Sequence, residues 1–373
     1  QVIDQGVTGF PAGFAAYVAW VDVLPKFQEM SDPEADASEN EDVPNEPAEP
    51  AVVIDRIDET TLNAALFFTV KPSELRILSV LGAGGHANVY KADWCRSFGM
   101  GTSSIIVAVK QLHTDLGEVY RNRERLTMLT DHPNLVKCMD STLEPPYLII
   151  TEFLAGGSLF DLLYNSSQEL SLWQSLKILL DVASGMRYLH EQKPCILHRD
   201  LKSSNILLAK PLRSATQEPF AKVADFGLSR TSSHSTGVTR EAMTAGVGTW
   251  RWMAPEVFEN DEGPDDVQYN SKADVYSFGI LMYEMLERRM PYSERFGNDI
   301  SDPRISLYVS RGLRPALESS SASASSEEGP TALIRKELIA LMQRAWDSDP
   351  SVRPDFQLLE EELRRLWSSA TLP

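Results

Sequence analysis

The apolar residues of this chain change their spacing at Gly156-Gly157. Before the two glycines, short apolar runs alternate with glycine-rich turns, at residues 75–81, 89–92, 105–110 and 147–153. Such runs are typical of strands in a small antiparallel sheet, and one helical stretch, residues 118–129, interrupts them. After the glycines the apolar residues follow helical spacing, at residues 172–190, 271–286 and 333–346. The pattern predicts an α+β chain with a small β-sheet lobe that carries one main helix, a larger and mostly helical lobe, and a ligand-binding cleft between them.

The residues before the predicted sheet have a different composition. Residues 31–50 hold eight acidic residues, several prolines and no Lys or Arg. Because so few apolar residues cannot offset the entropy lost on ordering, we predict a disordered linker over residues 31–73. It is either a passive spacer or a docking segment for a basic partner. Residues 1–30 form a separate segment, whose interrupted apolar stretch favours a buried helix or the end of an upstream domain over a membrane span or signal.

Net charge and cysteine content exclude several classes of protein. The formal net charge is −18, of which −10 remains outside residues 31–50, so a nucleic acid would be repelled. The cysteines Cys95, Cys138 and Cys195 are far apart and odd in number, which matches neither a zinc site nor a disulfide framework. We therefore expect free thiols and a cytoplasmic location, with no membrane span and no nucleic-acid partner.

Two features before Gly156 suit the binding of a phosphate. The first is a glycine-rich turn made of Gly82, Ala83, Gly84 and Gly85. Glycines let backbone N–H groups approach phosphate oxygens closely. The second is Lys110, which ends an apolar strand and would place an ammonium group in the cleft. Each signal is weak alone, because many hairpin turns are glycine-rich, many surface lysines end strands, and Ala87 replaces the third glycine of a G-x-G-x-x-G pattern.

Motifs farther along the chain are more specific. The chain carries HRDLKSSN at residues 198–205, DFG at 225–227 and APE at 254–256. Phosphoryl transfer from ATP needs a carboxylate that orients the attacking hydroxyl and accepts its proton, oxygen ligands for Mg²⁺, and cations that offset the developing charge. Asp200 suits the first task, Asn205 and Asp225 suit the second, and Lys110 with Lys202 suits the third.

With these motifs in this order, residues 74–368 resemble a protein-kinase catalytic domain, with an N-lobe over 74–154 and a C-lobe over 155–368. The sequences GTWRWMAPE at 248–256 and DVYSFG at 274–279 resemble the tyrosine-kinase-like group. An extra loop at 209–219 is similar to that of Roco-family and mixed-lineage-type kinases. The resemblance implies the two-lobed protein-kinase fold, ATP and Mg²⁺ as cofactors, and a protein as substrate.

The resemblance also implies a role for each matching residue. Asp200 matches the catalytic base, Lys110 the lysine that contacts the α- and β-phosphates, and Lys202 the residue that reaches the γ-phosphate. Asn205 and Asp225 match the metal ligands. Besides the glycine-rich turn, the expected nucleotide contacts are the apolar roof of Val89 and Ala108, the gatekeeper Thr151, the backbone of Glu152, Phe153 and Leu154, and Asp161. Asp161 either contacts the ribose or places a negative charge at a helix N-terminus.

Further residues match regulatory or structural positions. The glutamate that pairs with Lys110 is expected to be Glu124, with Glu118 as the alternative. Asp274 resembles the buried aspartate that accepts hydrogen bonds from the catalytic-loop backbone, and Glu256 with Arg353 resembles a partly buried ion pair. The expected activation loop, residues 228–253, carries candidate phosphorylation sites at Thr231, Ser232, Ser235, Thr236, Thr239 and Thr244. We expect phosphorylation of this loop, in trans between two transiently dimeric kinase molecules, to activate the enzyme, because the phosphate would pair with Arg199 and order the loop.

The resemblance points to a protein serine/threonine kinase. Lys202 and Thr249 both match residues of the Ser/Thr-kinase form of the site. A dual-specificity kinase is the alternative within the same class, and a pseudokinase scaffold is the alternative outside it. Lys110, Asp200, Asn205 and Asp225 are all present, which favours an active enzyme.

Overall fold

The computed structural model describes residues 70–83, 87–98, 101–113, 130–142, 144–193, 195–225, 250–259, 270–297, 304–317 and 329–370. All of these except Val70 belong to one compact unit that includes residues 71–373. The linker predicted over residues 31–73 therefore lies almost entirely outside the described residues, as do residues 1–30 and the predicted helix at 118–129. In the ranges given above, no helix combines the length and the apolar character that crossing a membrane requires.

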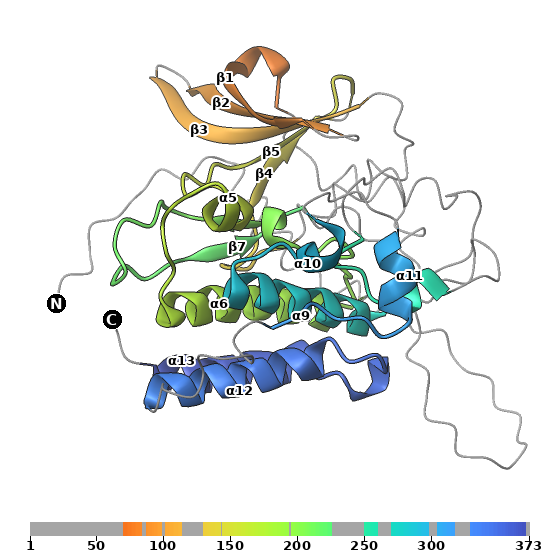
Figure 1. Ribbon diagram of the computed structural model, residues 1–373. Helices are drawn as coiled ribbons and strands as arrows, with labels where there is room; N and C mark the ends of the chain where they lie inside the picture. Colours follow the sequence, from red (N-terminus) through yellow and green to blue (C-terminus); the bar gives the residue numbers. More distant parts are fainter. Residues whose placement is uncertain are drawn as a thin grey trace, which may run out of the picture. The chain divides into compact units, whose positions relative to one another are not determined.

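A five-stranded antiparallel sheet forms the N-terminal part of the unit (Figure 1). Its strands are β1 (Leu75–Ala83), β2 (Ala87–Phe98), β3 (Gly101–Leu112), β4 (Cys138–Ser141) and β5 (Leu148–Glu152), and a short helix η2 (Pro72–Glu74) precedes them. Their order in the sheet is β1-β2-β3-β5-β4. The four strands predicted from apolar runs are confirmed. β4 was not predicted, because its sequence, CMDS, has no apolar alternation and includes the buried Asp140.

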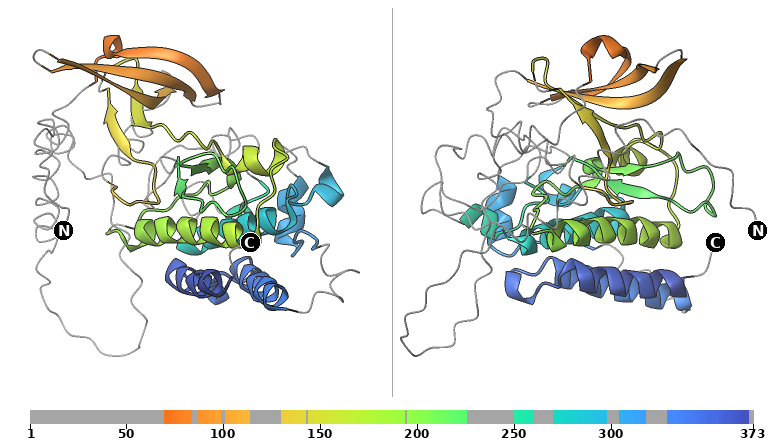
Figure 2. Two further views of the ribbon diagram at one scale, coloured as in Figure 1. Left: turned by 90° about the vertical axis from the view of Figure 1, so that its left-hand side faces the viewer. Right: turned by 180° about the vertical axis from the view of Figure 1, so that it is seen from behind.

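Helices build the rest of the unit, in two layers below the sheet (Figures 1 and 2). The upper layer holds α6 (Leu172–Glu191) and α9 (Ser271–Glu287), and the lower layer holds α12 (Pro330–Ala345) and α13 (Phe356–Ser369). The three helices predicted from apolar spacing are confirmed as α6, α9 and α12. Shorter helices cover the ends of these layers: α5 (Leu159–Tyr164), α8 (Glu256–Glu259), α10 (Ser293–Phe296), α11 (Arg304–Ser310), η4 (Ser203–Asn205) and η7 (Pro350–Val352).

The main hydrophobic core lies between these helices. α6 and α9 carry 13 buried residues each, because other elements cover them on nearly every side. A capping box fixes the start of α6: Gln174 N donates to Ser171 Oγ, and Ser171 N donates to Gln174 Oε1. α9 and the end of α12 approach so closely that a Cβ on Gly279 would lie 3.0 Å from Trp346 N. This spacing leaves no room for a side chain at position 279 between α9 and the end of α12.

A two-stranded hairpin of β6 (Ile206–Leu208) and β7 (Ala221–Val223) connects the helical part to the sheet. Val136 N donates to Val223 O at 2.9 Å, and Val223 N donates to Asn134 O at 2.8 Å, so the segment before β4 is fixed to β7. The extra loop at 209–219 joins β6 to β7 and is ordered, since Gln174 Nε2 donates to Ser214 O and Gln217 O. The loop is thus part of the folded unit.

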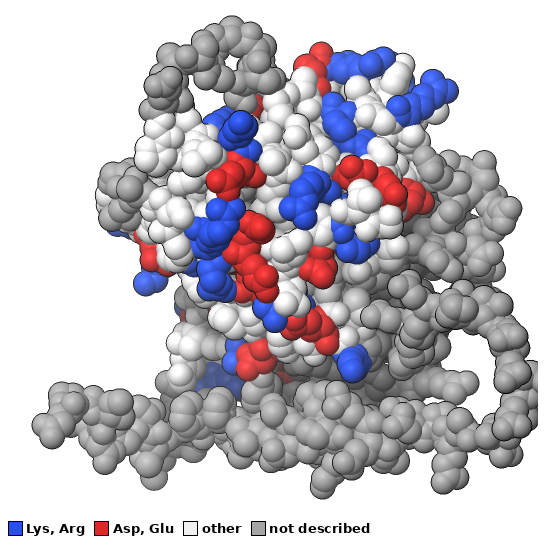
Figure 3. Space-filling model, turned by 90° about the horizontal axis from the view of Figure 1, so that it is seen from below, with Lys and Arg blue, Asp and Glu red and all other residues white. Residues whose placement is uncertain are grey.

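The surface seen from below carries both signs of charge (Figure 3). Ion pairs connect helices across this region, including Arg187 with Glu360 from α6 to α13 and Arg365 with Glu337 from α13 to α12. The Arg365–Glu337 pair is exposed, and exposed pairs contribute little stability each. The interleaved charges leave no field of one sign on the visible part of this face.

Candidate active site

Asp200 lies in a short loop between α6 and β6 and is fixed from two sides. Asn205 Nδ2 donates to Asp200 O at 2.7 Å and to Asp200 Oδ2 at 3.0 Å. Lys202 Nζ lies 2.8 Å from the same Oδ2 atom. The side chain of Asp200 is only 10% exposed, so the carboxylate is presented in one orientation. The motif at residues 198–205 thus brings together the three polar groups that the sequence singles out.

A buried aspartate on α9 holds the backbone of this loop. Asp274 accepts hydrogen bonds from His198 N and Arg199 N, both at 2.8 Å, and its Oδ2 lies 2.9 Å from His190 Nε2. Burial alone would raise the pKa of Asp274, but these hydrogen bonds and the nearby histidines lower it below its ordinary value. Arg199 has φ +67°, a left-handed conformation that costs a non-glycine residue about 1–3 kcal/mol. The role predicted for Asp274 is confirmed, since its bonds stabilise that strained turn.

Asp225 follows β7 and faces Lys110 of β3, with which it forms an ion pair. Loss of water around Asp225 would raise its pKa, but the Lys110 ammonium outweighs this effect and lowers it. Ala224 N donates to Asn205 O at 2.8 Å, which fixes Asp225 beside the Asp200 loop. Asp225 also has a positive φ, +61°. Two non-glycine residues of the same site therefore have strained backbone.

The register of the sheet places the other predicted nucleotide contacts on one face. Lys110 pairs with Val89 on β2, and Ala108 pairs with Thr151 on β5. Residues directly opposite each other in a sheet share a face, and so do residues two apart in one strand. One face of the sheet therefore carries Val89, Ala108, Lys110 and Thr151. The ion pair between Lys110 and Asp225 shows that Asp225 lies on the side of this face.

Glu152, at the end of β5, uses its side chain for contacts within the fold. Its Oε1 accepts a hydrogen bond from Lys137 N at 2.8 Å and pairs with Lys222 Nζ at 2.6 Å. These contacts connect the end of β5 to the segment before β4 and to β7. Lys91 Nζ lies 4.6 Å from the centre of the Phe153 ring, which connects β2 to the segment after β5.

The sequence model of the protein tyrosine and serine/threonine kinase family matches residues 75–363. The chain belongs to this protein kinase family. Among similar proteins, roco7 of Dictyostelium discoideum, named a probable serine/threonine-protein kinase, is 33% identical over 84% of the chain. The serine/threonine-protein kinases STY46 and CTR1 of Arabidopsis thaliana are 31% and 32% identical over 77% and 80% of the chain. The alignments cover 11%, 43% and 32% of the lengths of these three proteins, so the chain spans less than half of each.

In this kinase domain the described residues of the glycine-rich turn end strand β1. Gly82 and Ala83 belong to β1, whereas Gly84 and Gly85 lie outside the described residues. Ala87, which replaces the third glycine, is the first residue of β2 and is 8% exposed. Its methyl group packs in a small apolar cluster with Leu112 and Ile149. The substitution therefore adds packing within the kinase sheet.

Asp161 lies in the first turn of helix α5 of the kinase domain. Asp161 N donates to the Oγ of the N-cap residue Ser158 at 3.1 Å, and that hydroxyl donates to Asp161 Oδ2 at 2.6 Å. Asn165 Nδ2 donates to the other carboxylate oxygen at 2.9 Å. Of the two alternatives, the structure shows the charge at the helix N-terminus, while the ribose contact stays a prediction.

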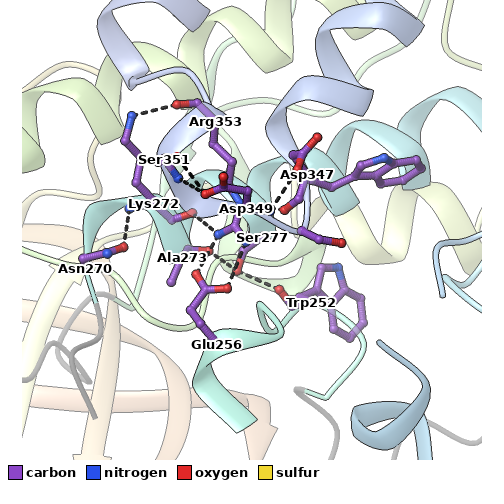
Figure 4. Close-up of polar contacts among 12 residues, drawn as sticks. Trp252, Glu256, Asn270, Lys272, Ala273, Ser277, Asp347, Asp349, Ser351 and Arg353 are labelled. Atoms are coloured by element: carbon purple, nitrogen blue, oxygen red, sulfur yellow. Dashed lines mark hydrogen bonds and ion pairs between the residues drawn. The ribbon is translucent and has the colours of Figure 1, made fainter. Parts of the chain in front are cut away.

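The ion pair predicted between Glu256 and Arg353 is confirmed (Figure 4). Arg353 donates through Nη1 and Nη2 to the two oxygens of Glu256, at 2.6 and 2.9 Å, and its side chain is fully buried. Arg353 Nε also donates to Asp347 O, and Lys272 Nζ donates to Arg353 O. The pair fixes α8, which begins at the glutamate of the APE motif, to α9 and η7.

Several predicted residues lie outside the described residues. Three groups are concerned: the two candidate partners of Lys110 (Glu118 and Glu124), Thr249, and the candidate phosphorylation sites Thr231, Ser232, Ser235, Thr236, Thr239 and Thr244. Their roles stay predictions.

One polar residue beside the site was not singled out from the sequence. Glu284 of α9 is fully buried and accepts hydrogen bonds from Ser203, Trp252 and Tyr164. Burial raises the pKa of Glu284 to about 7, and the three donors offset only part of this effect. The sequence signal that could have identified Glu284 is a glutamate inside an otherwise apolar helical stretch.

Proposed function

We propose that the chain is an ATP-dependent protein kinase that transfers the γ-phosphate of ATP to serine and threonine hydroxyls of protein substrates. The observation that carries the proposal is the arrangement of Asp200 beside Lys202 and Asn205, in a loop tied to the Lys110–Asp225 pair. The names of roco7, STY46 and CTR1 support the choice of serine and threonine.

Asp200 orients the attacking hydroxyl and accepts its proton. The hydroxyl oxygen then bonds to the γ-phosphorus, the bond from that phosphorus to the β-phosphate oxygen breaks, and ADP leaves with the electron pair. Lys202 lies on the same side of the loop, where its ammonium offsets the charge on the transferred group. Lys110 contacts the α- and β-phosphates.

The oxygen atoms of Asn205 and Asp225 fit a magnesium ion shared with phosphates. Asn205 uses its amide nitrogen to bind Asp200, which leaves its amide oxygen as a ligand, and Asp225 presents a carboxylate whose side chain is 39% exposed. One or two protein oxygens plus phosphate oxygens are the usual surroundings of this ion. Bound Mg²⁺ would neutralise phosphate charge during transfer.

The sheet face that carries Val89, Ala108 and Thr151 suits the adenine ring. The first two supply apolar contact above the ring, and Thr151 closes the pocket at its back. The Glu152 N–H donates to Lys137 O at 3.1 Å, so the Glu152 carbonyl would be the group that contacts the adenine edge, together with the backbone of Leu154. Gly82, Ala83, Gly84 and Gly85 would cover the phosphates.

Residues 250–255, which lead from the end of the activation loop into α8, would hold the substrate peptide, since α8 is anchored by the Glu256–Arg353 pair. Phosphorylation of the hydroxyls between Thr231 and Thr244 would regulate the enzyme, and Glu124 would complete the Lys110 pair. Residues 31–73 would act as the acidic linker, and transient dimers would allow phosphorylation in trans. The three free cysteines suit a reducing compartment such as the cytoplasm.

The test is phosphate transfer from labelled ATP with Mg²⁺, to the chain itself and to a basic protein. The wild-type chain should yield phosphoserine or phosphothreonine, and Asp200→Ala should lower kcat by at least about 10²-fold with little change in ATP affinity. Recovered phosphotyrosine would indicate dual specificity. A folded wild-type chain that binds ATP and transfers no phosphate, even after its loop is phosphorylated by another kinase, would contradict the proposal.

A further inference from the structure

The short helices α10 and α11 carry an exposed surface that has no part in the proposed transfer (Figure 1). Ile305 and Val309 of α11 are buried, at 0% and 1% exposed, whereas Leu307 on the other side of this helix is 50% exposed. One exposed leucine is ordinary on a protein surface. The unusual feature of Leu307 is that arginines surround it.

Two of these arginines share a side of the helix with Leu307. Arg304 precedes Leu307 by three residues and Arg311 follows it by four, which is the spacing of neighbours on a helix surface. The hydrogen bond from Arg311 N to Tyr308 O, at 3.1 Å, continues the helical turn as far as Arg311. Both arginines are exposed. An apolar side chain between two cations therefore faces the solvent.

A third arginine, Arg295, reaches this surface from α10. Its guanidinium carbon lies 4.0 Å from the centre of the Tyr308 ring and 5.8 Å from that of the Phe296 ring. The centres of these two rings are 5.5 Å apart, so the rings join α10 to α11. A guanidinium stacked on a ring still presents the N–H groups along its edge to a carboxylate. Among the described residues, neither Arg295 nor Arg311 forms an ion pair.

The charge of this surface is mainly positive. In residues 293–297 and 304–313 the exposed charged residues are three arginines and one glutamate, Glu294, whose Oε1 accepts a hydrogen bond from Ala316 N at 3.3 Å. Asp299 and Asp302, between the two helices, lie outside the described residues. Because the whole chain has a formal net charge of −18, a surplus of cations here is a local exception. Such a surface attracts an anionic partner.

Arg251 connects this surface to the segment proposed to hold the substrate peptide. It lies within residues 250–255, and it is fully buried. Its Nη1 donates to Pro291 O, before α10, and its Nη2 donates to Gly297 O, after α10, at 2.9 Å. α10 is therefore held in a fixed relation to that segment. A substrate bound at α10 and α11 would stay close to the catalytic loop, which raises its effective concentration there.

We propose that Arg295, Leu307 and Arg311 form a docking surface for an acidic segment of the protein substrate, in which carboxylates flank an apolar residue. The inference rests on the proposed kinase function and gives it a class of substrate. The carboxylates would pair with the two arginines, and the apolar residue would cover Leu307 and the Tyr308 ring. A nucleic acid offers charge to the arginines but little aliphatic surface to Leu307, and the net charge of the chain repels it.

Binding of a labelled peptide to the full chain tests the docking surface without any turnover. The probe has Asp and Glu on both sides of one Leu, and its control has Asn and Gln in place of Asp and Glu. Fluorescence anisotropy should show the acidic peptide binding at least about tenfold more tightly than the control at low ionic strength, and added salt should weaken it.

Substitutions on the surface should weaken this binding. We expect Arg295→Glu and Arg311→Glu each to weaken the acidic peptide at least about fivefold, and Leu307→Ser about threefold. Arg213→Glu is the matched control, because it reverses an exposed charge in the loop that joins β6 to β7, and it should leave the affinity unchanged within about twofold. Thermal unfolding shows whether each variant is folded, and if one of the three surface variants is not, the other two still decide the question.

Steady-state kinetics connects the docking to the transfer. A serine acceptor peptide that carries the acidic extension should have a KM about tenfold lower than the same acceptor with the neutral extension, and Arg311→Glu should remove this advantage. Affinity for the acidic peptide that is equal in the wild type and the surface variants, or is weakened as much by Arg213→Glu, would overturn the docking surface and leave the kinase function intact. Tighter binding of a DNA duplex than of the acidic peptide at the same arginines would overturn the choice of a protein partner. Arginine-dependent peptide binding by a chain that transfers no phosphate would support the surface and overturn the proposed function, and with it the assignment to a substrate.

Discussion

At Glu284, burial and hydrogen bonding act in opposite directions on the same carboxyl group. Its three partners are all donors, so the geometry suits the ionised carboxylate. Burial nevertheless raises its pKa from an ordinary 4.5 to about 7. Keeping the group ionised above this pH therefore costs stability, by about 3 kcal/mol at 1.36 kcal/mol per pKa unit. The same charge is what orders Ser203 and Trp252.

This conflict predicts a dependence of stability on pH. Between the two pKa values the native state holds more protons at this residue than the unfolded state does, so raising the pH favours unfolding. From pH ~5 to pH ~7.5 the group should lower the free energy of unfolding by about 2 kcal/mol. Urea unfolding of the wild type and of Glu284→Gln, at both pH values, measures this term as the difference between their pH dependences. Parallel pH profiles for the two chains would contradict the shifted pKa.

At the scale of elements, close backbone contacts fix how the helices meet the segments from the sheet. Gly185 on α6 is the clearest case, because a Cβ there would lie 2.8 Å from Asn134 O, a backbone atom. Asn134 O also accepts the hydrogen bond from Val223 N. The absence of a side chain at position 185 thus allows α6, the segment before β4 and β7 to meet.

Gly185→Ala should destabilise the domain although alanine is the better helix former. The change favours the helix by about 1 kcal/mol, but the methyl group must displace Asn134, and such overpacking costs about 1–3 kcal/mol. Because the displaced backbone also carries the bond to β7, we expect the larger cost and a lower Tm. Ser184→Ala, on the same helix and half-buried, is the control and should leave Tm unchanged or slightly higher. A higher Tm for Gly185→Ala would show that helix propensity outweighs the contact.

The elements that the sequence predicts well are those with regular apolar spacing. β1, β3, β5, α6, α9 and α12 fall close to the expected ranges, whereas β2 contains the expected residues 89–92 but continues to Phe98. α13 has the same kind of pattern, with Phe356, Leu359, Leu363 and Leu366 buried on one side, and was within reach of the same argument. β4 could not be predicted from apolar spacing, because its pairing with β5 and the burial of Asp140 depend on tertiary structure.

In the candidate site, too, some contacts could be predicted from the sequence and others depend on the fold. Asp200, Lys202 and Asn205 are close in sequence, so their motif predicts their proximity. Glu284 is 81 residues from Ser203 and 32 from Trp252, and nothing local in the sequence indicates that these three side chains meet. The positive φ values at Arg199 and Asp225 also require the fold, since neither residue is the glycine that such a conformation favours.

At the scale of the whole domain, two ion pairs between described residues connect the sheet to β7 and the residues that follow it, near the proposed nucleotide site. Lys110 of β3 pairs with Asp225, and Glu152 of β5 pairs with Lys222 of β7. The second pair is largely shielded, with side chains 28% and 13% exposed. Since Lys222 lies three residues before Asp225, this pair fixes the end of β5 relative to a proposed metal ligand.

Lys222→Ala should therefore weaken nucleotide binding without touching the nucleotide. Loss of the ammonium leaves Glu152 with the hydrogen bond from Lys137 N, and β7 becomes free to shift against β5. The proposed adenine contacts at Glu152 and Leu154 and the proposed phosphate-side contacts at Asp225 would then no longer be held at one separation. We expect the KM for ATP to rise about three- to tenfold, which corresponds to ~0.7–1.4 kcal/mol, with a smaller change in kcat.

Lys137→Ala is the matched control, because its side chain is exposed while its backbone N–H keeps the bond to Glu152, and it should leave both constants unchanged. Equal ATP KM values for the wild type and Lys222→Ala would show that the backbone contacts of Asn134 and Val136 with β7 suffice to hold the two parts together.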